Sequence, residues 1–207
     1  MPIDIPPPPP ASISSLSAAL SRIAAAHSLA AQAPSLARSA NRAVRERGTA
    51  DVSTPVLSSP VYVLGLDAIV AGRDLAGAKL GLWTHFLPSA QGADDVVSAD
   101  VSADTSRFAS LNEGPQVLGF FRQVRTLQQA ADLGPQSFGL AQLRVPALHV
   151  EAVWLRDRAG TGGIVIPVAP TSPALSAGRR YSVAEFLAAL RPAAEAALAN
   201  TDPRKGG

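Results

Sequence analysis

The sequence contains no cysteine, and this absence excludes disulfide bonds, thiolate zinc sites, iron–sulfur clusters and cysteine nucleophiles. The signatures of several enzyme classes are missing as well. There is no GxxxxGK phosphate loop, no GxSxG nucleophile elbow and no GxGxxG stretch between a strand and a helix. The spacings HxxxH and HxxE, which many metal sites use, do not occur either. We therefore expect a protein with no metal and no cofactor.

Charged and aromatic residues are scarce, at 16% and 5% of the chain, whereas hydrophobic residues make up 47%. This composition is typical of a globular protein whose core is built mainly from Ala, Val and Leu. The net charge of +2 is too small to indicate a strongly basic nucleic-acid binder. At 207 residues, the chain fits one ordinary domain with additional segments.

Long hydrophobic runs are also absent. The longest apolar stretches reach about 10 residues, which is half the length that a bilayer span requires. The opening sequence MPIDIPPPPP lacks the cationic region that begins a signal peptide. We expect no membrane span, no export signal and a cytoplasmic location.

The first 60 residues divide into three predicted segments. The unbroken prolines 6–10 favour an extended conformation, so we expect residues 1–11 to form a disordered tail. Apolar residues then recur every three or four positions, which predicts an amphipathic helical arm over residues 12–47. Residues 48–60 are rich in Ser, Thr and Pro, and we expect them to form a linker. The apolar stripe of the arm includes Ile13, Leu16, Leu20 and Ile23.

A basic stripe lies on the second half of the arm, where Arg38, Arg42 and Arg45 share one helix face and Arg47 lies close by. A solvated helix face explains this stripe better than contacts with nucleic acid, because no aromatic residues for base stacking are interleaved. Nucleic acid is therefore the least favoured partner.

Residues 61–200 combine strand and helix patterns and predict an α+β domain. A helix that Asn112 caps follows the first strands, and a second helix ends the domain. No strand is regularly followed by a helix that would return the chain to a parallel neighbour. We therefore predict a curved, mostly antiparallel sheet of about five strands with helices packed on one face. The predicted strands cover residues 61–70, 79–87 and 94–104, and a hairpin covers residues 144–168.

Two short patterns make specific structural predictions. The tandem VSADVSAD, residues 97–104, places Ser98 and Asp100 on one strand face, and this regular polar face predicts a strand with one side in water. Ser182 and Glu185 have the spacing of a capping box, in which each side chain accepts the backbone N–H of the other residue.

Four polar residues are candidate ligand-binding groups. His149 and Glu151 are two residues apart in a predicted strand, so alternation places them on one face. A histidine oriented by a glutamate is suited to acid–base chemistry, although such residues on a half-exposed strand are more often ordinary surface residues. Asp67 and His85 join the candidates if their strands neighbour this one. The HxE pair is too small a fragment to predict a metal site.

Two functions from different classes remain in competition. The favoured hypothesis is a non-enzymatic protein-interaction or assembly module. A helical arm that is apolar on one side must bury that side against its own domain or against a partner. We therefore expect a protein partner or self-association through the stripe of the arm. The alternative is a small-ligand-binding protein or an enzyme with a pocket between the sheet and a helix.

Overall fold

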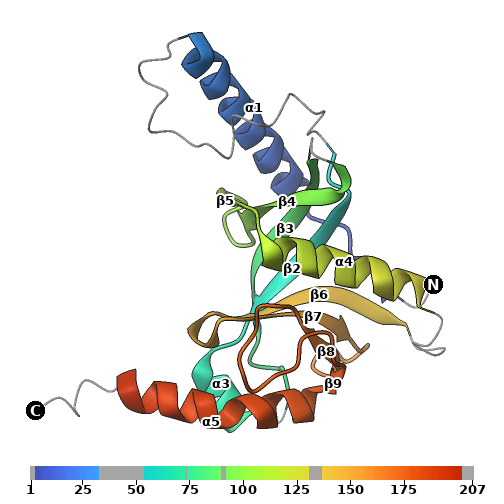
Figure 1. Ribbon diagram of the computed structural model, residues 1–207, viewed down its shortest axis with the longest axis vertical. Coiled ribbons are helices and arrows are strands. Elements are labelled where there is room, and N and C mark those ends of the chain that lie inside the picture. Colours follow the sequence, from blue (N-terminus) through green and yellow to red (C-terminus); the bar gives the residue numbers. More distant parts are fainter. Residues whose placement is uncertain (1–2, 33–53, 73, 90–91, 131–136, 202–207) are drawn as a thin grey trace, which may run out of the picture.

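The computed structural model describes residues 3–32, 54–72, 74–89, 92–130 and 137–201 (Figure 1). It confirms the α+β class and the mostly antiparallel sheet, but the predicted curved sheet of about five strands is wrong, because the sheet is open and has nine strands. One open sheet of nine strands has the order β5-β4-β3-β2-β6-β7-β8-β9, and β1 pairs with β6 beside that path. Only β1 and β2 run parallel to their neighbour β6, whereas the other described pairs are antiparallel. The strands are β1 (Ile3–Asp4), β2 (Leu57–Val63), β3 (Lys79–Ser89), β4 (Gly92–Ser102), β5 (Phe108–Asn112), β6 (Phe138–Val145), β7 (Val150–Arg156), β8 (Gly163–Pro167) and β9 (Tyr181–Ser182).

The helices of the described ranges are α1 (Pro10–Gln32), α3 (Leu66–Ala71), α4 (Pro115–Gln129) and α5 (Val183–Thr201). None of these helices combines the length and the hydropathy needed to cross a membrane. The capping box at the start of α5 is confirmed: the N–H of Ser182 donates to Oε2 of Glu185 at 2.8 Å, and the N–H of Glu185 donates to Oγ of Ser182 at 3.3 Å.

Helices cover both faces of the sheet, so the prediction of helices on one face is wrong. Alternation along β6 shows the two faces: Leu140 packs with Phe120 of α4, whereas Leu143 packs with Phe186 of α5. Figure 1 shows α4 and α5 on opposite sides of β6. The third apolar cluster, around Leu16 of α1, lies against the β3–β5 part of the sheet. The sheet thus separates an α4 face from a face shared by α1, α3 and α5.

The predicted strand over residues 61–70 is wrong in its second half. The strand β2 ends at Val63, and Leu66–Ala71 form α3, a short helix between Gly65 and Gly72. Short apolar runs suit a buried strand or a buried helix equally well, because alternation and helical spacing overlap over so few residues. The turn of α3 buries Ile69 in the cluster that it shares with α5.

The predicted hairpin over residues 144–168 is confirmed only in part. The pairing of β7 with β8 is present, but the segment before it belongs to β6 and to a short 3-10 turn, Pro146–Leu148. Proline restricts the backbone and cannot donate to a strand ladder, which accounts for the break at this point. His149 follows in the left-handed conformation, with φ of 51°. It therefore lies outside the strand that carries Glu151.

The N-terminal segments are part of the domain in the described residues. The strand β1 pairs with β6, and Ile3 packs against the α4-face cluster, although a disordered tail was expected here. Likewise, β2 begins at Leu57, inside the predicted linker. The predicted Arg38–Arg47 stripe lies outside the described residues.

The arm helix packs on its own sheet. Leu16 is 1% exposed in the cluster beside β4, and Leu20 packs against the same cluster. The backbone N–H of Phe108 donates to Oγ of Ser15 at 3.1 Å, which ties α1 to the edge strand β5. The first half of the arm is thus bound to the domain through both apolar and polar contacts.

Candidate functional site

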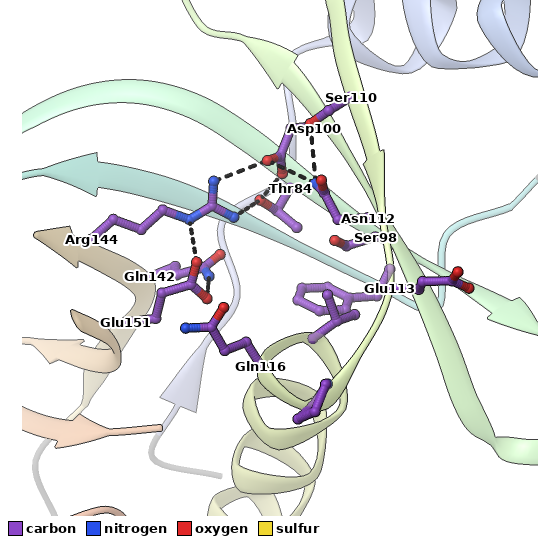
Figure 2. A pocket seen from close by; sticks show the side chains of 13 residues that line it. Thr84, Ser98, Asp100, Ser110, Asn112, Glu113, Gln116, Gln142, Arg144 and Glu151 are labelled. Atoms are coloured by element: carbon purple, nitrogen blue, oxygen red, sulfur yellow. Dashed lines mark hydrogen bonds and ion pairs between the residues drawn. The ribbon is translucent and has the colours of Figure 1, made fainter. Parts of the chain in front are cut away.

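A polar cleft of about 430 Å³ opens on the α4 face of the sheet, beside the N-terminus of α4. The first turn of α4 starts at Pro115, and the fully buried residues of this helix begin at Phe120, so the cleft lies beside the half-buried start of the helix. Figure 2 shows side chains from β3, β4, β5, β6 and β7 surrounding this space together with Gln116 of α4. The cleft is lined by Thr84, Phe86, Ser98, Asp100, Ser110, Asn112, Glu113, Pro115, Gln116, Val117, Gln142, Arg144 and Glu151.

Strand register brings these side chains together. Thr84 lies opposite Asp100, and Asp100 lies opposite Ser110, so β3, β4 and β5 present polar groups in one row. On the other side of the cleft, Arg144 of β6 lies opposite Glu151 of β7. Cross-strand partners point to the same face of a sheet, which is why residues distant in sequence converge here.

Asp100 is the most deeply buried charge in this group, at 3% exposure. The hydroxyl of Thr84 donates to Oδ1 at 2.5 Å, while Nδ2 of Asn112 and Nη1 of Arg144 donate to Oδ2 at 3.2 Å and 2.9 Å. Three donors therefore satisfy both carboxylate oxygens, as a buried carboxylate requires.

Arg144 connects Asp100 to Glu151. Its Nε lies 3.3 Å from Oε1 of Glu151, and its Nη2 donates to Oγ1 of Thr84 at 3.4 Å. The guanidinium is thus held between two carboxylates, on a side chain that is 18% exposed. We call the connected set Thr84, Asp100, Asn112, Gln142, Arg144 and Glu151 the Asp100 network (Figure 2).

Gln142 joins the network through one of its two polar atoms. Nε2 donates to Oε2 of Glu151 at 3.2 Å, whereas Oε1 is buried without a hydrogen-bond partner, on a residue that is 2% exposed. Burial raises the pKa of Glu151, the Arg144 guanidinium offsets part of this, and the charge of Asp100 adds to it. The network therefore ends at the cleft in a desolvated carboxyl group and an unused acceptor, and Nε of Arg144 is also buried without a hydrogen-bond partner.

The sequence-predicted ligand residues do not share a site. Glu151 lines the cleft, whereas Asp67 is exposed on α3 and His149 is exposed after the 3-10 turn. His85 is fully buried and faces away from the cleft, because its neighbour Thr84 points into it. The expected pairing of His149 with Glu151 on one strand face is wrong.

His85 instead joins α1 to the sheet. Its Nε2 lies 2.7 Å from Oγ of Ser12 in α1, and its Nδ1 lies 2.9 Å from Oγ of Ser58 in β2. Burial lowers the pKa of His85, against a weaker opposing effect of Asp100. We call His85, Ser12 and Ser58 the His85 cluster. Ser12 is 1% exposed, so this serine–histidine contact is not placed to attack a substrate.

Sequence reasoning missed most of the Asp100 network. Ser98 and Asp100 were expected to face water, but they are 2% and 3% exposed, so the solvated face predicted within residues 97–104 is wrong for these two residues. The alternation itself was correct, since Val97, Ala99 and Val101 face the α1 cluster. The sequence signal that could have identified this part of the site is the regular polar face of a strand whose other face is apolar. The same pattern occurs whether the polar side chains face water or are buried, so it does not predict burial.

Metal binding has no support in the described part of the chain, where no three histidine, aspartate or glutamate side chains gather as a ligand set. Comparisons of the chain with protein-family models, with curated proteins and with solved structures gave no match. The geometry of the cleft is therefore the basis for the function proposed below.

Proposed function

We propose that this protein binds a small polar ligand in the cleft beside the N-terminus of α4. The observation that carries the proposal is the unfinished state of the Asp100 network, in which the buried oxygen Oε1 of Gln142 has no partner. Buried polar groups in folded proteins nearly always have partners, so a group without one requires an explanation, such as a bound water, ion or ligand. A concave space with a few converging polar groups is the usual form of a small-molecule site.

Stability alone does not account for the network. Removing two carboxylates and a guanidinium from water costs several kcal/mol per ion, and apolar residues of similar volume in such places are often as stabilising or more so, by about 1–4 kcal/mol. The rest of the α4 face is apolar, with Leu140, Val153 and Leu155 on the same strands. Charged groups take the place of this apolar packing beside the first turn of α4, where the cleft lies, and this placement is consistent with a binding role.

The contacts of the arm make the competing interaction hypothesis less well supported. Its motivation was an apolar helix face in need of cover, and the sheet covers Leu16 and Leu20. Strand addition to β8 would be another way to bind a partner, but β9 already pairs with Ile164 and Val165 of that strand. Partner binding through Ile13, Leu16, Leu20 and Ile23 stays a prediction. A deletion of residues 1–50 would remove β1 and Ser12 together with the arm. A test of partner binding therefore requires substitutions in the apolar stripe of the arm rather than a deletion.

Ligand screening with a blocked cleft tests the proposal directly. Saturation-transfer NMR of a library of polar metabolites, including amines, polyols, amino acids, nucleosides and organic acids, is performed on the native protein and on Gln116→Trp. The indole at residue 116 would fill the cleft from the first turn of α4. Gln129→Trp, on an exposed residue at the other end of the same helix, is the matched control.

We expect at least one class of metabolite to bind the native protein and Gln129→Trp but not Gln116→Trp. Binding that persists in Gln116→Trp would place the ligand elsewhere and overturn the proposal. A library without any ligand for the native protein would overturn it as well. Amide NMR spectra of both variants check that each one keeps the native fold.

A further inference from the structure

Resting on the proposed function, we infer that the ligand carries a primary ammonium group, which binds between the carboxylate of Glu151 and the amide oxygen of Gln142. These two groups are held together by the contact between Nε2 of Gln142 and Oε2 of Glu151 at 3.2 Å. The carboxylate supplies negative charge, and the amide supplies an acceptor that the protein leaves unused. An ammonium group offers three N–H donors and no acceptor, which matches this pair.

The charges around the cleft favour a cation. Two of its buried or half-buried lining residues, Asp100 and Glu151, carry carboxylates, whereas Arg144 carries the single guanidinium between them. Partly buried charges are screened less by water than surface charges, so this imbalance acts on whatever enters. A ligand with a positive charge reduces the imbalance, and an anionic ligand increases it.

Arg144 is not placed to attract an anion. Its Nη1 donates to Asp100 at 2.9 Å, its Nη2 donates to Thr84 at 3.4 Å, and its Nε lies 3.3 Å from Glu151. A phosphate or carboxylate ligand at this arginine would also approach the carboxylates of Asp100 and Glu151, which lie 2.9 Å and 3.3 Å from the guanidinium. Repulsion between like charges in this partly buried place disfavours anion binding.

The orientation of the Gln142 amide points to a donor from the ligand. A carboxylate accepts hydrogen bonds only, so Nε2 must face Glu151 while that residue is ionised, and Oε1 is then turned away from it. A buried acceptor without a partner costs about 1–3 kcal/mol, and a ligand that donates to it recovers part of this cost. A hydroxyl group would also donate, but it would add no positive charge beside Glu151, which shares the guanidinium of Arg144 with Asp100.

The pH dependence of ligand affinity supplies an independent test of this arrangement. The charged groups near Glu151 are Arg144 from β6 and Asp100 from β4, and Gln142 donates to it. Burial raises the pKa of the Glu151 carboxyl in the free protein. A bound ammonium group stabilises the ionised form, so its affinity should increase as the pH rises through that pKa.

Three matched probes test the inference: glucamine, sorbitol and gluconate. They share a six-carbon polyol chain and differ at one end, which is an ammonium, a hydroxyl or a carboxylate group. Titrations of the native protein are followed by amide chemical shifts of the residues that line the cleft. We expect glucamine to bind about tenfold more tightly than sorbitol, and gluconate more weakly than both, because one charge-assisted contact distinguishes the probes.

Two variants assign the charge that is responsible. Glu151→Gln keeps the shape of the side chain and should reduce the preference for glucamine over sorbitol to less than about twofold. Glu195→Gln, on an exposed residue of α5, should leave the preference unchanged. In the native protein, the affinity for glucamine should increase with pH and then reach a plateau, whereas the affinity for sorbitol should not change. This pH series tests the inference even if Glu151→Gln does not fold.

The outcomes separate this inference from the proposed function. Equal affinities for glucamine and sorbitol, or tighter binding of gluconate, would overturn the ammonium inference while cleft binding itself stands. A preference for glucamine that survives in Glu151→Gln would overturn the assignment to this carboxylate. If none of the three probes binds, the inference fails, and the metabolite screen decides the proposed function separately.

Discussion

Two neighbouring residues of β3 belong to two very different buried polar groups. His85 faces α1 and forms the His85 cluster, in which both ring nitrogens have a serine partner within 2.9 Å. Thr84 faces the opposite side of the sheet and belongs to the Asp100 network. The cluster is neutral, small and fully enclosed. The network is charged, extends over five strands and opens into a cleft.

The difference between them indicates what each is for. Because each nitrogen of His85 has a partner, the cluster resembles the polar contacts that fix one arrangement of packed elements. The Asp100 network leaves Oε1 of Gln142 without a partner and keeps Glu151 desolvated at its end. The complete cluster fits a structural role, whereas the incomplete network at the cleft is the basis of the proposed ligand site. The predictions below test this contrast.

The largest effect is expected from removing the cation of the network. Arg144→Met would leave the carboxylate of Asp100, at 3% exposure, without its ion-pair partner. Loss of one partner from a buried pair destabilises proteins by about 3–5 kcal/mol. Urea unfolding at neutral pH measures this as a decrease in the free energy of unfolding.

The same substitution on an exposed residue of α4, Arg122→Met, is the matched control and should change the stability by less than about 0.5 kcal/mol. Combining Arg144→Met with Asp100→Asn should restore part of the loss, because no buried charge would then remain unpaired at that position. If Arg144→Met is as stable as the native protein, the network is not the desolvated charge cluster that we describe.

A smaller effect is expected from the His85 cluster. His85→Leu leaves the hydroxyls of Ser12 and Ser58 without their buried partner, which should destabilise the protein by about 1–3 kcal/mol. Adding Ser12→Ala and Ser58→Ala removes the unsatisfied groups, so the triple variant should recover most of the stability. Urea unfolding and the affinity for the cleft ligand are measured together, and ligand affinity should be the same in the native and triple-variant proteins. A triple variant less stable than His85→Leu would contradict a purely structural role.

Sequence patterns were sufficient for the class of the fold and for much of its local structure. The strands β3 and β4, the helix α4 and the capping box of α5 follow from alternation, helical spacing and capping preferences. The strand β6 was not identified, although it lies at the middle of the sheet and pairs with β1, β2 and β7. It is buried on both faces for most of its length, so its sequence lacks the alternation that identifies a half-exposed strand.

The candidate site was less predictable because it depends on register. Glu151 was identified as a candidate, but its partner Arg144 was not, since only the turn between β6 and β7 brings them opposite each other. Asp100 of β4 meets Arg144 of β6 across β3 and β2, and 44 residues separate the two in the sequence. The polar face of β4 gave no sign that α4 and the neighbouring strands would bury it. Burial of polar groups is a property of the tertiary structure.

The smallest expected effect is the pH dependence of the free energy of unfolding, which should have opposite signs for His85 and for Glu151. Burial lowers the pKa of His85 below its usual 6.5, so below that pH the unfolded chain binds a proton that the folded chain does not. The contribution of His85 to the free energy of unfolding is therefore lost as the pH falls below 6.5. Burial raises the pKa of Glu151 above its usual 4.5, so its contribution is present below pH 4.5 and is lost as the pH rises through the folded-state pKa.

Urea unfolding of the native protein and of two variants over a series of pH values separates these contributions. The triple variant of the His85 cluster should lose less stability than the native protein as the pH falls below 6.5. Glu151→Gln should lose less stability than the native protein as the pH rises above 4.5. Glu195→Gln, with its exposed side chain, should follow the native curve. The two pH effects have opposite signs because the cluster buries a base, His85, and the network buries an acid, Glu151. If both variants change the stability in the same pH range, or if neither changes it, the closed cluster and the open network do not differ in the way proposed.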